Sequence, residues 1–155
     1  MIKHFDGDAT QPVLQAGHNV IVHCVNNIGA WGAGFVVPLG RRFPMAREAY
    51  MNARKRELGS IQVVLVQPDR VSPLFVCNLV GQRGIASPSN PSPISYEAFE
   101  EGFASLEEHM QQRGGAWTLH MPKMGAGLAG GNWETIERLL QMHISYPIYV
   151  YTPRR

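Results

Sequence analysis

The spacing of short apolar runs constrains the fold of this chain more than any other feature of its sequence. Five runs of strand length are rich in β-branched and aromatic residues. They are Val20–Val25, Ile61–Gln67, Leu74–Leu79, Trp117–Met121 and Ile148–Tyr151, and a short sixth strand is expected near Ile2–Phe5. Because these runs are continuously apolar rather than alternating, we expect strands that are covered on both faces.

Segments with helical periodicity separate the strands. Pro44–Leu58 begins with a proline, which suits a first helical turn, and stops before Gly59, which suits a helix end. Ser95–Gln112 and Trp133–His143 carry apolar residues at three- and four-residue spacing, and a short fourth helix is expected at Pro12–Gln15. Strands that alternate with helices predict an α/β protein built as a three-layer α/β/α sandwich.

Composition limits the class of protein. The chain has 155 residues, which fits a single domain over residues 1–155. Its 45% hydrophobic and 17% charged residues are typical of a globular protein rather than a disordered one. Cys24 and Cys77 lie within apolar runs, which favours free core thiols in a reducing compartment. Because no segment resembles a signal peptide or a membrane helix, we expect a cytoplasmic protein.

Charge and ligand spacing limit the partners. The formal net charge of +2 is too small to indicate nucleic-acid binding by itself. A basic cluster comprises Arg41, Arg42, Arg47, Arg54, Lys55 and Arg56. On a helix such a cluster is usually a solvated face, and nucleic-acid contact stays open as the alternative. No group of histidines, cysteines and carboxylates has the spacing of metal ligands, so we expect no metal and no cofactor.

Two glycine-rich loops, Gly29–Gly34 and Gly125–Gly131, each follow a predicted strand and precede a helix-forming segment. Glycine lets the backbone approach a ligand closely and adopt positive φ. In an open α/β sheet, loops at such positions bind ligands, especially phosphates held by backbone amides. Neither loop has the spacing of a P-loop or a dinucleotide fingerprint. Two such loops on one sheet, the first preceded by Asn26-Asn27, favour a diphosphate ligand.

Four motifs carry a family resemblance. They are "GDAT" (Gly7–Thr10), "HCVNNIGAWGAGF" (His23–Phe35), "NLVGQ" (Asn78–Gln82) and "MPKMGAGLAGGNW" (Met121–Trp133). Together they resemble a macrodomain, an ADP-ribose-binding α/β/α module with a central mixed sheet. The two loops are similar to those of the branch that includes ADP-ribose-1''-phosphate phosphatases and single-domain ADP-ribosyl hydrolases. The resemblance implies a domain that binds ADP-ribose or an ADP-ribosyl group and hydrolyses a bond at the distal ribose. We also expect a monomer.

The resemblance also implies a role for individual residues. Asp8 would accept a hydrogen bond from the adenine amino group beside the amide of Ala9, and Tyr151 would flank the adenine. Asn26 would bind a hydroxyl of the distal ribose. The amides around the ribose and diphosphate would come from Gly32, Ala33, Gly34 and Phe35 on one side and Gly125, Ala126, Gly127 and Leu128 on the other, with Gln82 near the rim. In the alternative, Asp8 caps a turn.

The catalytic group is the open question of the sequence. Lysine-dependent hydrolases of this branch have a lysine after the first loop, where this chain has Gly40 followed by two arginines, and an arginine cannot replace a lysine nucleophile. The phosphatases resemble this chain at His23 and at the loop that begins with Asn26. His23 would act as a general acid/base near neutral pH, and Asn26, which positions the ribose, is the second catalytic candidate. The acid partner of His23 would be Glu134 or Asp6. The alternatives are a structural His23 and a reader module without catalysis.

Overall fold

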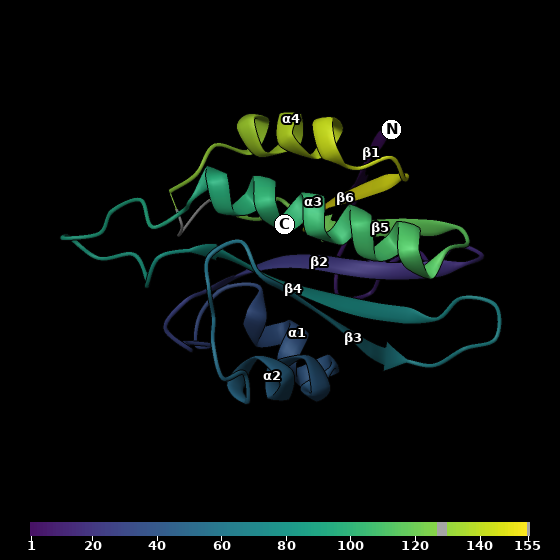
Figure 1. Cartoon of the computed structure of the whole chain (residues 1–155), viewed down its shortest axis with the longest axis horizontal. Coiled ribbons are helices and arrows are strands. Elements are labelled where there is room, and N and C mark those ends of the chain that lie inside the picture. The colour runs from purple at the N-terminus through teal and green to yellow at the C-terminus, as the bar shows by residue number, and fades with distance from the viewer. Residues whose placement is uncertain (127–129, 155) are drawn as a thin grey trace.

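In the computed structural model of the protein, which describes residues 1–126 and 130–154, six strands form one mixed sheet between two helical layers (Figure 1). The strand order is β1-β6-β5-β2-β4-β3, and only the edge strand β3 runs antiparallel to its neighbour. The strands are β1 (Ile2–Asp6), β2 (His18–Asn26), β3 (Ile61–Gln67), β4 (Leu74–Gln82), β5 (Trp117–Pro122) and β6 (Ile148–Thr152). All six predicted strands are confirmed.

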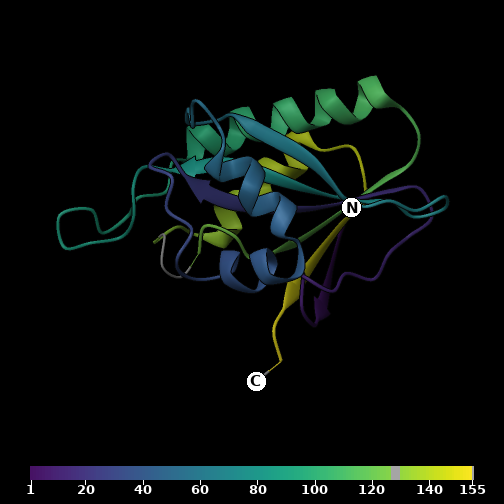
Figure 2. The ribbon, with the colours of Figure 1, turned by 90° about the horizontal axis from the view of Figure 1, so that it is seen from below.

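The helices cover the sheet in two pairs. They are α1 (Val36–Arg42), α2 (Pro44–Met51), α3 (Tyr96–Arg113) and α4 (Trp133–His143). Figure 1 shows α3 and α4 above the sheet and α1 and α2 below it, and the view from below in Figure 2 places α1 and α2 nearest the reader. The α/β/α sandwich with a mixed central sheet is therefore confirmed. No helix in the described part of the chain is both long and apolar enough to cross a membrane.

The helix predictions differ from the structure in three places. α2 ends at Met51 rather than Leu58, where the Arg56 guanidinium folds back and donates to the carbonyls of Tyr50 and Met51. α1 was not predicted, although its Pro38 lies in the first turn, where a missing N–H costs no helical hydrogen bond.

The helix expected at Pro12–Gln15 is wrong. The backbone N–H groups of this segment bond to side chains of the sheet instead of to one another. Val13 N donates to the Tyr151 hydroxyl at 3.0 Å, and Gln15 N donates to Asn19 Oδ1 at 3.0 Å. The segment is therefore an extended connection that is held down by the strands beneath it.

Strand β2 holds the two halves of the core together. Val20 and Val22 belong to the cluster that faces α3 and α4, whereas Ile21 belongs to the cluster that faces α1 and α2. All three side chains are completely buried. Because successive side chains of a strand point to opposite faces, an unbroken apolar run is what a strand between two helical layers requires.

A buried polar chain crosses the strands near the N-terminal loop. His120 bonds through Nε2 to Asn19 Oδ1 at 2.8 Å and through Nδ1 to the Tyr151 hydroxyl at 2.9 Å. The Asn19 amide nitrogen donates to the Gln15 and Gly17 carbonyls, so its oxygen faces His120 and Nε2 must carry the proton. A neutral imidazole gives both of its ring nitrogens a hydrogen-bond partner in this network. Burial lowers the pKa of His120 to about 4.

This histidine makes stability depend on pH. An unfolded histidine has a pKa near 6.5, whereas folded His120 has a pKa of about 4. Between these pH values the unfolded chain binds more protons than the folded protein, so acid favours unfolding. We expect the His120→Gln variant to lose less stability over this window, by at most about 1.4 kcal/mol per pH unit. Denaturant titrations at several pH values measure both slopes; equal slopes would show that His120 does not titrate as inferred.

Candidate functional site

Two loops meet at one edge of the sheet because their strands are parallel neighbours. β2 pairs with both β4 and β5 in parallel, so the carboxyl ends of these three strands lie together. Loop 1, residues 27–35, follows β2; loop 2, residues 123–132, follows β5 and is described at 123–126 and 130–132. Ligands of open α/β sheets bind at such an edge.

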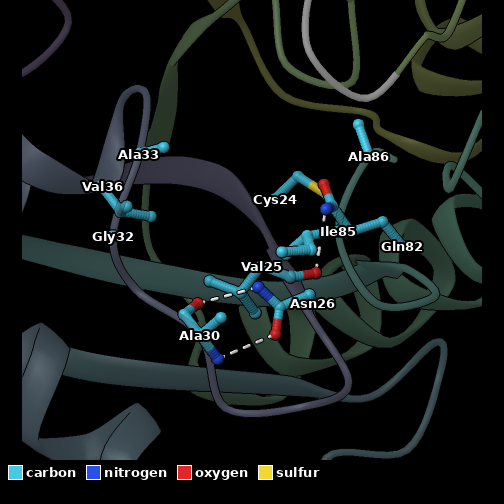
Figure 3. Close-up of a pocket in the computed structure, with 10 residues that line it drawn as sticks. All are labelled: Cys24, Val25, Asn26, Ala30, Gly32, Ala33, Val36, Gln82, Ile85 and Ala86. Carbon is cyan, nitrogen blue, oxygen red and sulfur yellow. Dashed lines mark hydrogen bonds between the residues drawn. The ribbon is translucent and has the colours of Figure 1, made fainter. Parts of the chain in front are cut away.

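The larger hollow, which we call the loop-1 cavity, has a volume of about 370 Å³. Figure 3 shows Gly32, Ala33 and Val36 on one side of it and Gln82, Ile85 and Ala86 on the other. The rest of the lining comes from Cys24, Val25, Asn26 and Ala30. None of these ten residues is charged, so the cavity fits an uncharged group with a few hydroxyls better than an anion.

The second hollow, which we call the interloop cavity, lies between the two loops and has a volume of about 190 Å³. It is lined by His23, Cys24, Ala33, Gly34, Phe35, Val36 and Gln82, and from the β5 side by Pro122, Lys123, Met124, Gly125 and Ala126. Four residues line both hollows, so the two adjoin. Gly34 and Gly125 from the two loops and Lys123 line this cavity, and backbone amides together with a basic residue are the groups that hold a diphosphate.

Asn26 holds loop 1 in shape. Its Nδ2 donates to the Ala30 carbonyl at 2.8 Å, and its Oδ1 accepts from the amides of Ala30 at 3.0 Å and Ile28 at 3.1 Å. The Tyr50 hydroxyl donates to the same oxygen at 2.6 Å. Asn26 therefore lies on the loop-1 cavity, as the ribose assignment requires, but its carboxamide oxygen is committed to the loop and to α2.

The segment between β4 and α3, residues 83–95, contacts both loops. It projects from the sheet edge in Figures 1 and 2 and supplies Ile85 and Ala86 to the loop-1 cavity. At one end Gly84 N donates to Asn27 Oδ1 at 2.8 Å, and at the other Ser92 Oγ donates to the Gly130 carbonyl at 3.1 Å. These two hydrogen bonds tie the segment to loop 1 and to loop 2.

His23 is buried beneath the interloop cavity and is 1% exposed. Its Nε2 lies 2.5 Å from Asn78 Oδ1, and Asn78 Nδ2 donates to the Ala46 carbonyl and to Gln62 Oε1. The asparagine oxygen thus faces the ring, which fixes Nε2 as the protonated nitrogen; Nδ1 is buried without a partner among the described residues. Burial lowers the pKa of His23 to about 4.

The expectation that His23 titrates near neutral pH is therefore wrong. The ring is neutral at pH 7, and its recorded hydrogen-bond partner is Asn78 rather than Glu134 or Asp6. Cys24 is no better suited to proton transfer, because burial raises the pKa of its thiol to about 12. The structure favours the structural interpretation of His23.

A lysine after loop 1 would not fit this chain as it is folded. A Cβ atom at Gly40 would lie 2.7 Å from Trp31 Nε1, so the indole occupies the space beside this position. Loop 2, residues 123–132, contains no carboxylate in its sequence. The indole beside Gly40 adds a steric reason to the interpretation that disfavours lysine-type covalent chemistry, which stays a prediction.

Of the three residues predicted at the adenine, only Asp8 is exposed. Asp8 is exposed, and its Oδ1 accepts from Thr10 N at 2.8 Å and from Thr10 Oγ1 at 2.7 Å, so Asp8 does cap a turn. Ala9 is buried next to it. Tyr151 is 3% exposed and bonds to His120 and Val13, so it supports the N-terminal loop from below rather than offering a ring to a ligand.

The structure brings most of the remaining predicted residues together. Gly32, Ala33, Gly34, Phe35, Gln82, Gly125 and Ala126 all line one or both cavities. Gly127 and Leu128 lie outside the described residues. Sequence reasoning missed Lys123 and Ile85: the lysine was visible inside the "MPKMGAGLAGGNW" motif, whereas no local signal places Ile85 at a cavity. The described residues contain no cluster of metal-ligating side chains.

Two facing loops on a mixed α/β/α sheet define a ligand-binding domain, and comparison with known proteins identifies its family. The chain is 30% identical to the solved structure of a macrodomain protein from Streptomyces coelicolor, covering 98% of this chain and 99% of that one at a TM-score of 0.80. The chain therefore belongs to the macrodomain family. No family model matches the chain.

Named relatives differ in how much of their length this chain spans. ADP-ribose 1''-phosphate phosphatase of Candida albicans is 25% identical over 97% of this chain and 99% of that protein. DNA ADP-ribosyl glycohydrolase of Thermus aquaticus is 26% identical over 91% of this chain and 39% of that protein. Chromodomain-helicase-DNA-binding protein 1-like of Danio rerio and of Mus musculus is 30% and 31% identical, but the chain spans only 14% and 17% of those proteins.

Substitution of His23 tests its structural role. His23→Ala removes a buried ring and leaves Asn78 Oδ1 unpaired, so we expect the free energy of unfolding to fall by about 2–4 kcal/mol. ADP-ribose affinity should stay within a few fold of wild type at a temperature where the variant is folded. Denaturant titration and calorimetry measure the two effects, with the exposed His4→Ala variant as the control. A stable variant that had lost binding or turnover would return His23 to the chemistry of the site.

Proposed function

We propose that this macrodomain binds ADP-ribose or an ADP-ribosyl group and hydrolyses a bond at the distal ribose. The observation that carries the proposal is the pair of adjoining cavities between two glycine loops at the carboxyl ends of parallel strands. One cavity offers backbone amides and a lysine, and the other offers an apolar hollow with a few polar atoms. A diphosphate joined to a pentose needs these two environments side by side.

The ligand would extend along the sheet edge, with its diphosphate between the distal ribose and the adenine. The diphosphate would occupy the interloop cavity, with the amides of loop 1 on one side, those of Gly125 and Ala126 on the other, and the Lys123 ammonium at the mouth. The distal ribose would enter the loop-1 cavity beside Gln82. The adenine would extend toward Asp8, whose Oδ2 has no recorded hydrogen bond within the described chain.

The lining of the loop-1 cavity bears on the bond that is cleaved. The named relatives include a phosphatase and a glycohydrolase, which release a phosphate and an ADP-ribosyl group respectively from their substrates. A phosphate dianion on the distal ribose would enter a cavity whose ten lining residues carry no charge, and burial of an unpaired charge is costly. An uncharged linkage at the ribose meets no such penalty, so this lining favours an ADP-ribosyl linkage as the substrate.

A second candidate function is a reader that binds ADP-ribose without chemistry. Of the described side chains on the two cavities, His23 has a pKa of about 4 and the Cys24 thiol a pKa of about 12, so neither transfers a proton readily at pH 7. This observation favours the reader, whereas the names of the relatives that match at full or partial length favour the enzyme.

One series of measurements separates these functions. Calorimetric titration with ADP-ribose tests the binding, and no heat of binding at millimolar ligand would reject the whole proposal. Incubation with ADP-ribose-1''-phosphate and with an ADP-ribosyl ester then tests hydrolysis. We expect cleavage of the ester to exceed phosphate release. Binding without cleavage of either compound would leave the reader.

Gly32 offers a clean block of the ligand cavity. It lines the loop-1 cavity without positive φ, and a Cβ atom placed on it meets no atom within 4 Å. We expect Gly32→Leu to change the free energy of unfolding by less than about 0.5 kcal/mol. ADP-ribose affinity should fall at least tenfold, because the new side chain fills space that the ribose needs. Ala104→Leu, on the exposed face of α3, is the matched control and should bind as wild type; unchanged affinity of Gly32→Leu would place the ligand elsewhere.

Asp8 tests the adenine end. Asp8→Ala should weaken ADP-ribose binding by about 1.5–3 kcal/mol, the value of a hydrogen bond to a charged group, and should affect ribose 5-phosphate far less. Asp8→Asn retains an oxygen for the turn at Thr10 but lacks the charge, so it separates the turn from adenine recognition. Calorimetry with both ligands measures the difference, and an equal loss for the two would remove Asp8 from the adenine site.

A further inference from the structure

The helical layers divide the charge of the protein between opposite faces. The layer of α1, α2 and the residues that follow α2 carries Arg41, Arg42, Arg47, Arg54, Lys55 and Arg56, with Glu48 as the single acid among positions 41–56; we call the exposed side of this layer the basic face. The opposite layer carries Glu97, Glu100, Glu101, Glu107 and Glu108 on α3 and Glu134 and Glu137 on α4. The small net charge of the whole chain therefore conceals a strongly basic surface.

The charges of the basic face are largely free. Every member except Arg56 is exposed. Lys55 lies 3.9 Å from the exposed Glu57, and within the described chain no ion pair neutralises the other five. Arg56 instead stacks over the Tyr50 ring at 5.0 Å. A group of unneutralised guanidinium ions on one surface attracts a polyanion, and it does so most strongly at low salt.

An aromatic hollow opens within this face. It has a volume of about 250 Å³ and is lined by Trp31, Val37, Gly40, Arg41 and Arg47; we call it the Trp31 hollow. The indole packs on its inner side against Tyr50, at 5.5 Å between ring centroids. Gly40 lets the backbone of α1 approach the indole closely, and the half-buried Trp31 still lines the hollow. A flat ring can stack there between an indole and two guanidinium groups.

We propose that the basic face binds single-stranded nucleic acid, with phosphates on the arginines and one base in the Trp31 hollow. An acidic peptide would satisfy the charges but would bring no flat ring to the hollow. Bases in a duplex are stacked within it and cannot enter, so an unpaired strand fits better. Five of the six basic residues are arginines, whose planar guanidinium binds phosphates in a bidentate way and stacks on bases.

The strand would pass close to the candidate active site. Trp31 belongs to loop 1, whose Ala30 and Gly32 line the loop-1 cavity. A nucleotide bound in the Trp31 hollow would therefore contact the same loop that lines the cavity assigned to the distal ribose. Binding to the strand does not depend on ADP-ribose recognition; where both hold, the substrate class is an ADP-ribosyl group carried on a nucleic acid.

Fluorescence anisotropy with unmodified, labelled oligonucleotides of about 20 nucleotides tests the inference, with oligo-dT and oligo-U as the DNA and RNA arms. We expect binding that weakens at least tenfold between about 50 and 200 mM salt. The pair Arg41→Glu and Arg47→Glu should reduce affinity at least tenfold. The pair Arg70→Glu and Arg138→Glu, which changes the net charge equally at exposed sites outside this face, should have little effect.

Three results would overturn the inference: no binding at low salt, equal losses in the two charge-reversal pairs, or tighter binding of polyglutamate than of either oligonucleotide. Trp31→Leu adds a second criterion, because loss of stacking should lower affinity while the dependence on salt stays the same. Calorimetry with ADP-ribose on the same proteins keeps the two proposals apart. A protein that binds the strand but not ADP-ribose rejects the proposed function alone, and the reverse result rejects only this inference.

Discussion

The parallel pairing of β2 with β4 and β5 is the constraint on which the rest of the structure depends. It requires an unbroken apolar strand, because both faces of β2 are covered by helices. It also brings the ends of three strands to one edge, where loop 1, loop 2 and residues 83–95 meet. The ligand cavities exist because these three connections start from neighbouring positions.

The sequence predicts the strands well and the helix ends poorly, for physical reasons. The strands at 61–67 and 148–152 are indicated by their β-branched residues, which are a local signal. The end of α2 at Met51 depends on a side chain five residues further on, Arg56, which caps its carbonyls. The short α1 was not predicted because it contains Pro38 and Gly40, two residue types that usually indicate a loop.

The site residues show the same division. The glycines that line the cavities could be identified from their position after strands, because that position has a fixed meaning in an α/β sheet. The protonation state of His23 could not be predicted from the sequence, because its pKa depends on burial and on Asn78, a residue from another strand. Likewise the role of Tyr151 depends on His120 and Val13, which are brought to it only by folding.

The attachment of residues 83–95 has a consequence for variation among related chains. The segment is fastened at its two ends, by Gly84 to loop 1 and by Ser92 to loop 2, and its outer turn is closed by mutual backbone hydrogen bonds between Ser87 and Asn90. Asn90 also donates to the carbonyls of Arg83 and Ile85, so insertions or grafted peptides that leave both anchors unaltered must keep this asparagine. The length of the chain between Ser87 and Asn90 can thus vary above a base whose position is fixed by hydrogen bonds.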